Sequence, residues 1–279
     1  MKKDMRMKSG ILLAAFGSGS NQGESALRRF EAQVRERFPA VAVRWAFTSG
    51  LMRERLAMVR KKSDSVQKAL DKMAFERFTH VGVQPLHVIS GLEYSDILAD
   101  AELLRQRTVF AALAVGAPLL TDATPCPHPS SIERVAEAML RALPATRCPD
   151  EAVLFMGHGT RHPAERLYES LSCAVQARDP LVFMGTLNGT LRLEHILPHL
   201  RTAGVKRAWL MPFLALVGRH TLEDMAGQAE RSWLSRLQAE GICCTPVLRG
   251  MIEHQAFSAI WLDHLAASMQ AWNTHRQTS

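Results

Sequence analysis

The chain has 279 residues, of which 47% are hydrophobic, so it can bury a large core as one large domain or as two of about 130 residues each. No stretch approaches the roughly 20 apolar residues that span a bilayer, so we expect no membrane-spanning segment and no membrane partner. The formal net charge is +7, but the basic residues are spread along the chain without an RNA-binding or helix-turn-helix signature. We therefore expect no nucleic-acid partner, and a small anionic substrate explains the charge equally well.

The cysteines and the N-terminus both point to the cytoplasm. The five cysteines are odd in number and lack the CxxC spacing of a zinc or redox site, which predicts reduced thiols. Basic residues precede the apolar run at 11–16, as in a signal peptide, but this run is too short for secretion. We expect this run to form the first strand instead.

A glycine-rich turn and a helix follow the first strand. The turn reads FGSGSNQG (16–23), and an amphipathic pattern over 24–39, ESALRRFEAQVRERFP, predicts the helix. The turn could cradle a phosphate, but it lacks the GKS or GKT of a P-loop and the full GxGxxG spacing. We expect no nucleotide site, and we count Ser18 among the candidate substrate-binding residues.

The segment VQPLHVISGLEYSDI (83–97) is an apolar run that is broken by a proline and leads through a glycine into a helix start. Glu93 lies in the expected first helical turn, where the helix dipole stabilises a carboxylate even without a catalytic role. His87 lies inside the apolar run, which predicts a histidine of the core or of a ligand-binding wall. Further along, LPATRCP (143–149) interrupts the helical pattern and predicts a domain boundary.

The segment AVLFMGHGTR (152–161) repeats the pattern of the first strand and its turn, and an amphipathic helical pattern over 164–180 follows it. His158 ends a hydrophobic run that is typical of a strand buried on both faces. Gly157 and Gly159 carry no Cβ, so the backbone can turn sharply and a flat ligand can approach closely. A tight turn whose imidazole caps a backbone carbonyl is the alternative interpretation.

The segment LMPFLALVGRHTLEDM (210–225) repeats the pattern of 83–97. Pro212 aligns with Pro85, and His220 aligns with Glu93. Two such repeats predict an α/β fold of two similar lobes, each a parallel β-sheet flanked by helices, with an active-site cleft between them. We expect an N-terminal lobe over 1–145 and a C-terminal lobe over 146–279, whose last helices, from about residue 254, cross back to the first lobe.

His158, His220 and Glu93 follow predicted strands, where ligands bind in parallel sheets. Two imidazoles and a carboxylate are suitable ligands for a divalent first-row metal ion. The same groups also accept protons near neutral pH. The sequence leaves both uses open.

Four segments together resemble the anaerobic cobalt chelatases: FTSGLM (47–52), QPLHVISGLEY (84–94), FMGHGT (155–160) and LMPFLALVGRHTLEDM (210–225). The resemblance implies insertion of cobalt(II) into sirohydrochlorin, or into a precorrin-2-type tetrapyrrole, in anaerobic cobalamin synthesis. The two-lobed fold that it implies is shared with class II ferrochelatases. It also implies that His158 is catalytic, that His158, His220 and Glu93 bind the metal, and that Glu93 also takes part in catalysis. The metal is a substrate, and no organic cofactor is expected.

The sequence departs from the family pattern at positions that carry negative charge. Asn188 stands where the family usually has an acidic metal ligand, and Arg219 stands where an aspartate is common. Arg161 and Arg219, with Gly157, Gly159, His87 and Ser18, are the expected contacts of the anionic tetrapyrrole. Iron insertion for sirohaem and a non-catalytic tetrapyrrole- or metal-binding protein remain the alternatives, and the sequence is compatible with a homo-oligomer.

Overall fold

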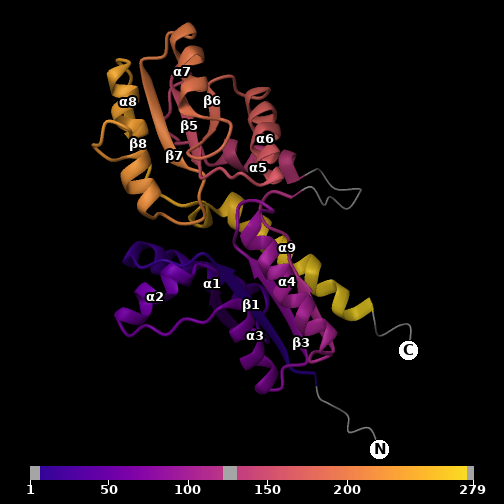
Figure 1. The fold of residues 1–279 in the computed structure, drawn as a ribbon. Coiled ribbons are helices and arrows are strands. Elements are labelled where there is room, and N and C mark those ends of the chain that lie inside the picture. Colours follow the sequence, from indigo (N-terminus) through magenta and orange to yellow (C-terminus); the bar gives the residue numbers. More distant parts are fainter. Residues whose placement is uncertain (1–6, 122–130, 275–279) are drawn as a thin grey trace, which may run out of the picture. The chain divides into compact units, whose positions relative to one another are not determined.

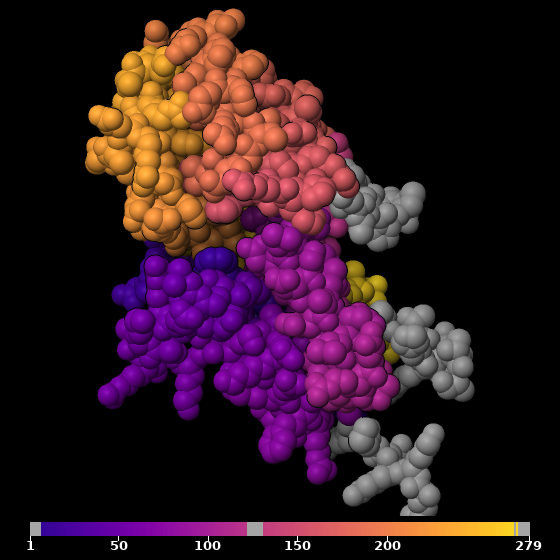
Figure 2. All heavy atoms as spheres, in the orientation of Figure 1, coloured from indigo at the N-terminus to yellow at the C-terminus, as the bar shows by residue number. Residues whose placement is uncertain are grey.

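The computed structural model of the chain describes residues 7–121 and 131–274, which fall into two compact units. Unit 1 comprises Met1–Pro118 and Ala259–Ser279, and unit 2 comprises Leu119–Ser258. Each unit holds one four-stranded parallel sheet with helices packed on it (Figure 1). The space between the ribbons inside each unit is filled by side chains (Figure 2).

The sheet of unit 1 has the strand order β2-β1-β3-β4, with every neighbouring pair parallel. Its elements, in chain order, are β1 (Ser9–Ala15), α1 (Asn21–Arg37), β2 (Ala42–Phe47), α2 (Gly50–Met58), α3 (Val66–Phe75), β3 (His80–Pro85), α4 (Leu92–Gln106) and β4 (Ala112–Val115).

The core of unit 1 follows from side-chain alternation along the central strands. Leu12 and Ala14 of β1 belong to a core cluster with residues of α3 and α4, so these two helices cover one face of the sheet. Gly82 of β3 points to the opposite face, where a Cβ atom would lie within 3.1 to 3.4 Å of side chains of α9 (Gln255–Thr274). Because both faces are covered, β1 is apolar at almost every position, as the sequence predicted.

Unit 2 repeats this topology, with the strand order β6-β5-β7-β8 and all pairs parallel. Its elements are α5 (Ser131–Arg141), β5 (Ala152–Gly157), η1 (Pro163–Glu165), α6 (Arg166–Gln176), β6 (Val182–Thr186), α7 (Leu193–Thr202), β7 (Arg207–Pro212), η2 (His220–Met225), α8 (Trp233–Ala239), β8 (Cys243–Pro246) and η3 (Met251–Glu253). The two equal strand orders confirm the predicted duplication of a parallel α/β unit.

The core of unit 2 also has two faces. Leu154 and Met156 of β5 belong to a cluster that includes residues of α7 and α8. On the other face Phe155 packs edge-on against Phe213, with ring centroids 6.3 Å apart, and Tyr168 of α6 packs on the same ring at 6.2 Å. The strand that leads to His158 is therefore packed on both faces.

The division of the chain differs from the predicted boundary at residue 145. Helix α5 lies before that residue but packs on α6 inside unit 2, where Glu133 forms an ion pair with Arg178. The segment at 143–149 is thus a loop within unit 2. The break in the helical pattern at 143–149 shows only that a helix ends there. Such a local signal cannot tell a loop inside a domain from a linker between domains.

The second division falls inside α9, so that residues from Ala259 onward group with unit 1. The Trp261 indole N–H donates a hydrogen bond to the carbonyl of His87 at 3.3 Å, and Arg37 pairs with Asp263 at 2.8 Å. Trp261 also packs edge-on against Phe30 of α1. These contacts tie the last helix to the sheet and helices of unit 1.

None of the helices that the structure describes combines the length and hydropathy needed to cross a bilayer.

Candidate active site

His158 is the first exposed residue after the buried strand β5. The loop that follows β6 lies directly beside it, because the backbone N–H of Asn188 donates to the carbonyl of His158 at 2.9 Å. The N–H of Leu187 likewise donates to the carbonyl of Gly157 at 3.0 Å. The parallel pairing of β5 and β6 therefore continues beyond the carboxyl ends of both strands and places Asn188 next to His158.

Both glycines beside His158 lie in close contacts, and packing against backbone requires the second, Gly159. Gly159 has a φ of +74°, and a Cβ atom there would lie 2.4 Å from the backbone nitrogen of Gly189. A Cβ atom on Gly157 would lie 2.7 Å from the methyl carbon of Met184. The absence of a side chain thus lets two loops touch through their backbones. The role of both glycines in substrate binding stays a prediction.

Two hydrogen bonds determine which nitrogen of His158 can act. Nδ1 lies 2.8 Å from the carbonyl oxygen of Gly159, which can only accept, so Nδ1 carries the proton of the neutral ring. Nε2 lies 3.4 Å from the side-chain nitrogen of Asn188 and accepts its N–H. The imidazole therefore caps a backbone carbonyl, as the alternative interpretation expected, while the lone pair on Nε2 accepts the long bond from Asn188.

His220 faces His158 from the segment that follows β7. It opens η2, a single π-helical turn, and π-helical turns are frequent at functional sites. Its Nδ1 lies 2.7 Å from a carboxylate oxygen of Asp224, which fixes the proton on Nδ1 and leaves Nε2 free to bind a metal ion. The rings of His220 and His158 have centroids 4.9 Å apart and planes inclined by 66°. The two predicted histidines thus lie in contact.

The donor set in unit 2 is two imidazoles and one amide. Asn188, exposed beside Nε2 of His158, occupies the position where a carboxylate would complete a three-ligand group. Among the residues that the structure describes, no three His, Cys, Asp or Glu side chains are arranged to hold a metal ion. The ligands present would bind a divalent ion weakly and leave most of its coordination positions open.

The arginines predicted to bind the substrate both lie in unit 2. Arg161 is exposed three residues after His158. Arg219, directly before His220, is also exposed and lies 3.7 Å from Glu223, with more than half of each side chain accessible. Such a weak surface ion pair costs little to break, so the guanidinium of Arg219 can turn to another carboxylate.

The remaining predicted residues belong to unit 1. Glu93 is exposed in the first turn of α4. His87 is largely buried, and burial lowers its pKa to about 4, although the nearby carboxylate of Glu93 opposes this shift. The His87 ring is therefore neutral at neutral pH, and its Nε2 lies 3.3 Å from the hydroxyl of Thr48. Its Nδ1 has no hydrogen-bond partner among the described residues. Ser18 is buried beside the start of α1, where its hydroxyl accepts from the N–H of Ser20 at 3.2 Å.

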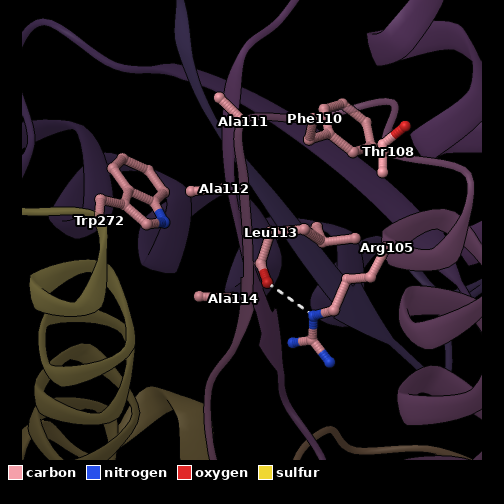
Figure 3. A pocket seen from close by; sticks show the side chains of 8 residues that line it. All are labelled: Arg105, Thr108, Phe110, Ala111, Ala112, Leu113, Ala114 and Trp272. Atoms are coloured by element: carbon pink, nitrogen blue, oxygen red, sulfur yellow. Dashed lines mark hydrogen bonds between the residues drawn. The ribbon is translucent and has the colours of Figure 1, made fainter. Parts of the chain in front are cut away.

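A pocket in unit 1 contains none of the predicted residues. It lies along the edge strand β4, between Trp272 and Arg105, whose Nε donates to the carbonyl of Leu113 at 3.0 Å (Figure 3). Alanine side chains form much of its wall, and the described residues that line it include no imidazole or carboxylate. The pocket therefore does not supply the chemistry of metal or proton transfer.

Sequence reasoning missed two carboxylates of unit 2. Asp224 stands four residues after His220, and this i,i+4 spacing within a helical start could have indicated the contact. Glu165 is 7% exposed and accepts hydrogen bonds from the two loops that carry His158 and Asn188. No local pattern predicts its burial, because a glutamate at a helix start is usually solvated.

Known proteins match this chain over most of its length. The sequence model of a family described as "Cobalt chelatase (CbiK)" matches residues 9–270. The chain is 59% identical over 264 residues to a protein of Nitratidesulfovibrio vulgaris named sirohydrochlorin cobaltochelatase CbiKC, which covers 95% of this chain and 92% of that protein. A protein of Salmonella typhimurium named sirohydrochlorin cobaltochelatase is 31% identical over 264 residues, covering 93% and 96% of the two chains.

One solved structure shows the shared fold. SirB from Bacillus subtilis with Fe3+ superposes with a TM-score of 0.65 at 16% sequence identity, over 97% of this chain and 98% of that one. This likeness confirms the predicted chelatase-type α/β fold.

Proposed function

This chain belongs to the cobalt chelatase (CbiK) family, and from that premise we propose that it inserts cobalt(II) into sirohydrochlorin. The observation that carries the proposal is the contact between His158 and His220, whose ring centroids are 4.9 Å apart. Because each Nδ1 is engaged by a neighbouring acceptor, both Nε2 atoms are unprotonated in the neutral rings, and only the long Asn188 bond must break to release the lone pair of His158. Two such nitrogens can receive a divalent first-row ion and also accept protons.

Insertion removes two protons from pyrrole nitrogens and moves the ion from protein ligands to the ring. We assign the proton-accepting step to Nε2 of His158. Once this atom is protonated it becomes a donor, and Asn188 can answer by presenting its amide oxygen in place of its N–H. A side chain that both donates and accepts therefore stays bonded to His158 in either protonation state.

His220 holds the incoming ion in this account. The carboxylate of Asp224 accepts the Nδ1–H of His220 at 2.7 Å and so orients Nε2 as a ligand. Few protein ligands suit a metal that must leave, because a closed set of four ligands would retain it as a structural ion. Asn188, a neutral side chain where an acidic one would bind more strongly, favours release.

The remaining predicted residues keep their proposed roles. The exposed guanidinium groups of Arg161 and Arg219 bind carboxylates of the tetrapyrrole through charge-assisted hydrogen bonds. In unit 1, Glu93 is proposed to supply a carboxylate to the metal. The variant Glu93→Gln tests this role, because it should raise the KM for cobalt and leave the KM for sirohydrochlorin unchanged.

Sirohydrochlorin metallation under anaerobic conditions tests the proposed function. The protein is mixed with sirohydrochlorin and either cobalt(II) or iron(II), and the visible spectrum is followed beside a control without protein. We expect many cobalt products per protein molecule at a rate above the control. A faster reaction with iron would favour a ferrochelatase for sirohaem, whereas binding without turnover would favour a non-catalytic tetrapyrrole-binding protein.

We further propose that the reaction takes place in the cytoplasm and needs no organic cofactor. Four cysteines of the described residues are free thiols, which suits a reducing compartment. Metal exchange and proton transfer require only ligands and bases, and the imidazoles supply both.

A further inference from the structure

Glu165 ends the short helical turn η1 directly before α6, and it is only 7% exposed. Its carboxylate accepts hydrogen bonds from neutral donors. The backbone N–H of Thr160 donates to Oε2 at 2.8 Å, and the backbone N–H of Thr190 donates to Oε1 at 2.9 Å. The hydroxyl of Thr186 adds a weaker bond to Oε1 at 3.4 Å. A carboxylate is rarely buried without a specific purpose, because its desolvation must be offset by such bonds.

The two backbone donors belong to the two loops of the candidate site. Thr160 stands two residues after His158, and Thr190 stands two residues after Asn188. One carboxylate oxygen therefore holds the turn after β5, and the other holds the loop after β6. The loops also touch where Gly159 meets Gly189. A Cβ atom on Gly189 would lie 1.7 Å from Oε1 of Glu165, so the loop is pressed directly onto the carboxylate.

We propose that Glu165 is a positioning residue for the chelatase reaction: it clamps the two loops together and so sets the position of the Asn188 amide against Nε2 of His158. The inference rests on the proposed function. His158 and Asn188 make a side-chain contact of 3.4 Å, at the long end of a hydrogen bond, so small shifts of either loop break it. The carboxylate of Glu165 bonds to the backbone of the two loops, and it acts on Nε2 of His158 and on the Asn188 amide only by positioning those loops.

The neighbouring Glu169 offers a matched control. It is an exposed residue one helical turn further along α6, and its carboxylate accepts the hydroxyl of Thr190 at 2.7 Å. It contacts the loop after β6, which Glu165 also contacts. Within the residues that the structure describes, it accepts only a side-chain hydroxyl and makes no hydrogen bond with the loop after β5. The variants Glu165→Gln and Glu169→Gln therefore remove the same charge, while only the first loses a backbone hydrogen bond and with it the link between the two loops.

Glu165→Gln turns one acceptor oxygen into an N–H₂ group, which must face a backbone N–H in one of the two loops. We expect kcat for cobalt insertion to fall by about 10- to 100-fold, as when a supporting partner of a metal ligand is lost, with the KM for sirohydrochlorin within twofold of the parent value. Glu165→Asp keeps both oxygens on a shorter stem and should recover part of kcat. Glu169→Gln should keep kcat within twofold.

Two further measurements separate positioning from general stability and from the proposed function itself. Near-ultraviolet circular dichroism gives the folded fraction of each variant, and the visible spectrum of bound cobalt(II) without tetrapyrrole reports the ligand geometry. We expect Glu165→Gln to be folded and to change the cobalt spectrum. The proposal is overturned if kcat of folded Glu165→Gln equals that of the parent, or if the loss of activity merely follows the unfolded fraction. A parent protein that binds cobalt but never metallates sirohydrochlorin refutes the proposed function, and an unchanged cobalt spectrum in Glu165→Gln then refutes the clamp separately.

Discussion

Removal of the Asp224 carboxylate should weaken cobalt binding while leaving the fold intact. Nδ1 of His220 lies 2.7 Å from Oδ2 of Asp224, and this bond both orients the imidazole and keeps Nε2 available as a ligand. In Asp224→Ala the ring loses its acceptor, so it can rotate and can carry its proton on either nitrogen. Part of the population then presents an N–H to the metal ion in place of a lone pair.

The expected magnitude follows from the exposure of the pair. A hydrogen bond to a charged group contributes about 1.5–3 kcal/mol when water is excluded. The side chains of His220 and Asp224 are 34% and 22% exposed, so water competes for both. We therefore expect a loss of about 1–2 kcal/mol, which corresponds to roughly 5- to 30-fold weaker binding of cobalt(II). Asp224→Asn keeps an oxygen acceptor and should lose less.

Anaerobic titration with cobalt(II), followed by visible absorption near neutral pH, measures this affinity. Glu223→Gln is the control, because Glu223 is the acidic neighbour on the same turn and faces Arg219. Glu223→Gln should bind cobalt as the parent does. Asp224→Ala with an affinity within twofold of the parent would refute the assignment of His220 as an oriented metal ligand.

The other predictions concern the metal site, the glycine turn and the response to acid. Asn188→Asp places a negative charge near the divalent ion, and the attraction between the two charges is about 2 kcal/mol at roughly 4 Å in water. The same titration should therefore show about 30-fold tighter cobalt binding. Gly159→Ala should lower the urea-unfolding free energy by about 1–3 kcal/mol more than Gly204→Ala. Both glycines have a positive φ, but only Gly159 meets a backbone atom at 2.4 Å. Burial and the charge of Arg249 lower the pKa of His254 to about 4, so the unfolded chain binds the proton first as the pH falls from about 6.5 to 4. His254 should thus cost up to about 3 kcal/mol of stability across that range, and unfolding of His254→Gln should depend less steeply on pH.

Much of the fold could be read from local patterns. The apolar run at β5 predicts a strand covered on both faces, and the run at β1 predicts the first strand. The repeated strand, turn and helix predict two parallel sheets. The start of α1 was missed by three residues, because Ser20 caps the helix and the glycine-rich stretch after it already forms the first turn. The predicted helix at 164–180 begins as the short turn η1 and becomes α-helical only at Arg166.

The histidine pair could also be predicted, since the carboxyl ends of β5 and β7 lie side by side in the sheet. Asn188 followed for the same reason from β6. The roles of Asp224 and Glu165 could not be derived, because they depend on which loops close over which side chains. A sequence gives the charge of a glutamate but not the backbone N–H groups that surround it in the folded chain.

Cobalt insertion by His158→Ala tests the central claim most directly. The variant is compared with the parent and with His195→Ala, an exposed histidine of α7, at saturating cobalt and sirohydrochlorin under anaerobic conditions. If Nε2 of His158 accepts the pyrrole proton, the rate should fall by about 10²- to 10⁴-fold in His158→Ala and stay unchanged in His195→Ala. Equal rates for the parent and His158→Ala would contradict the account.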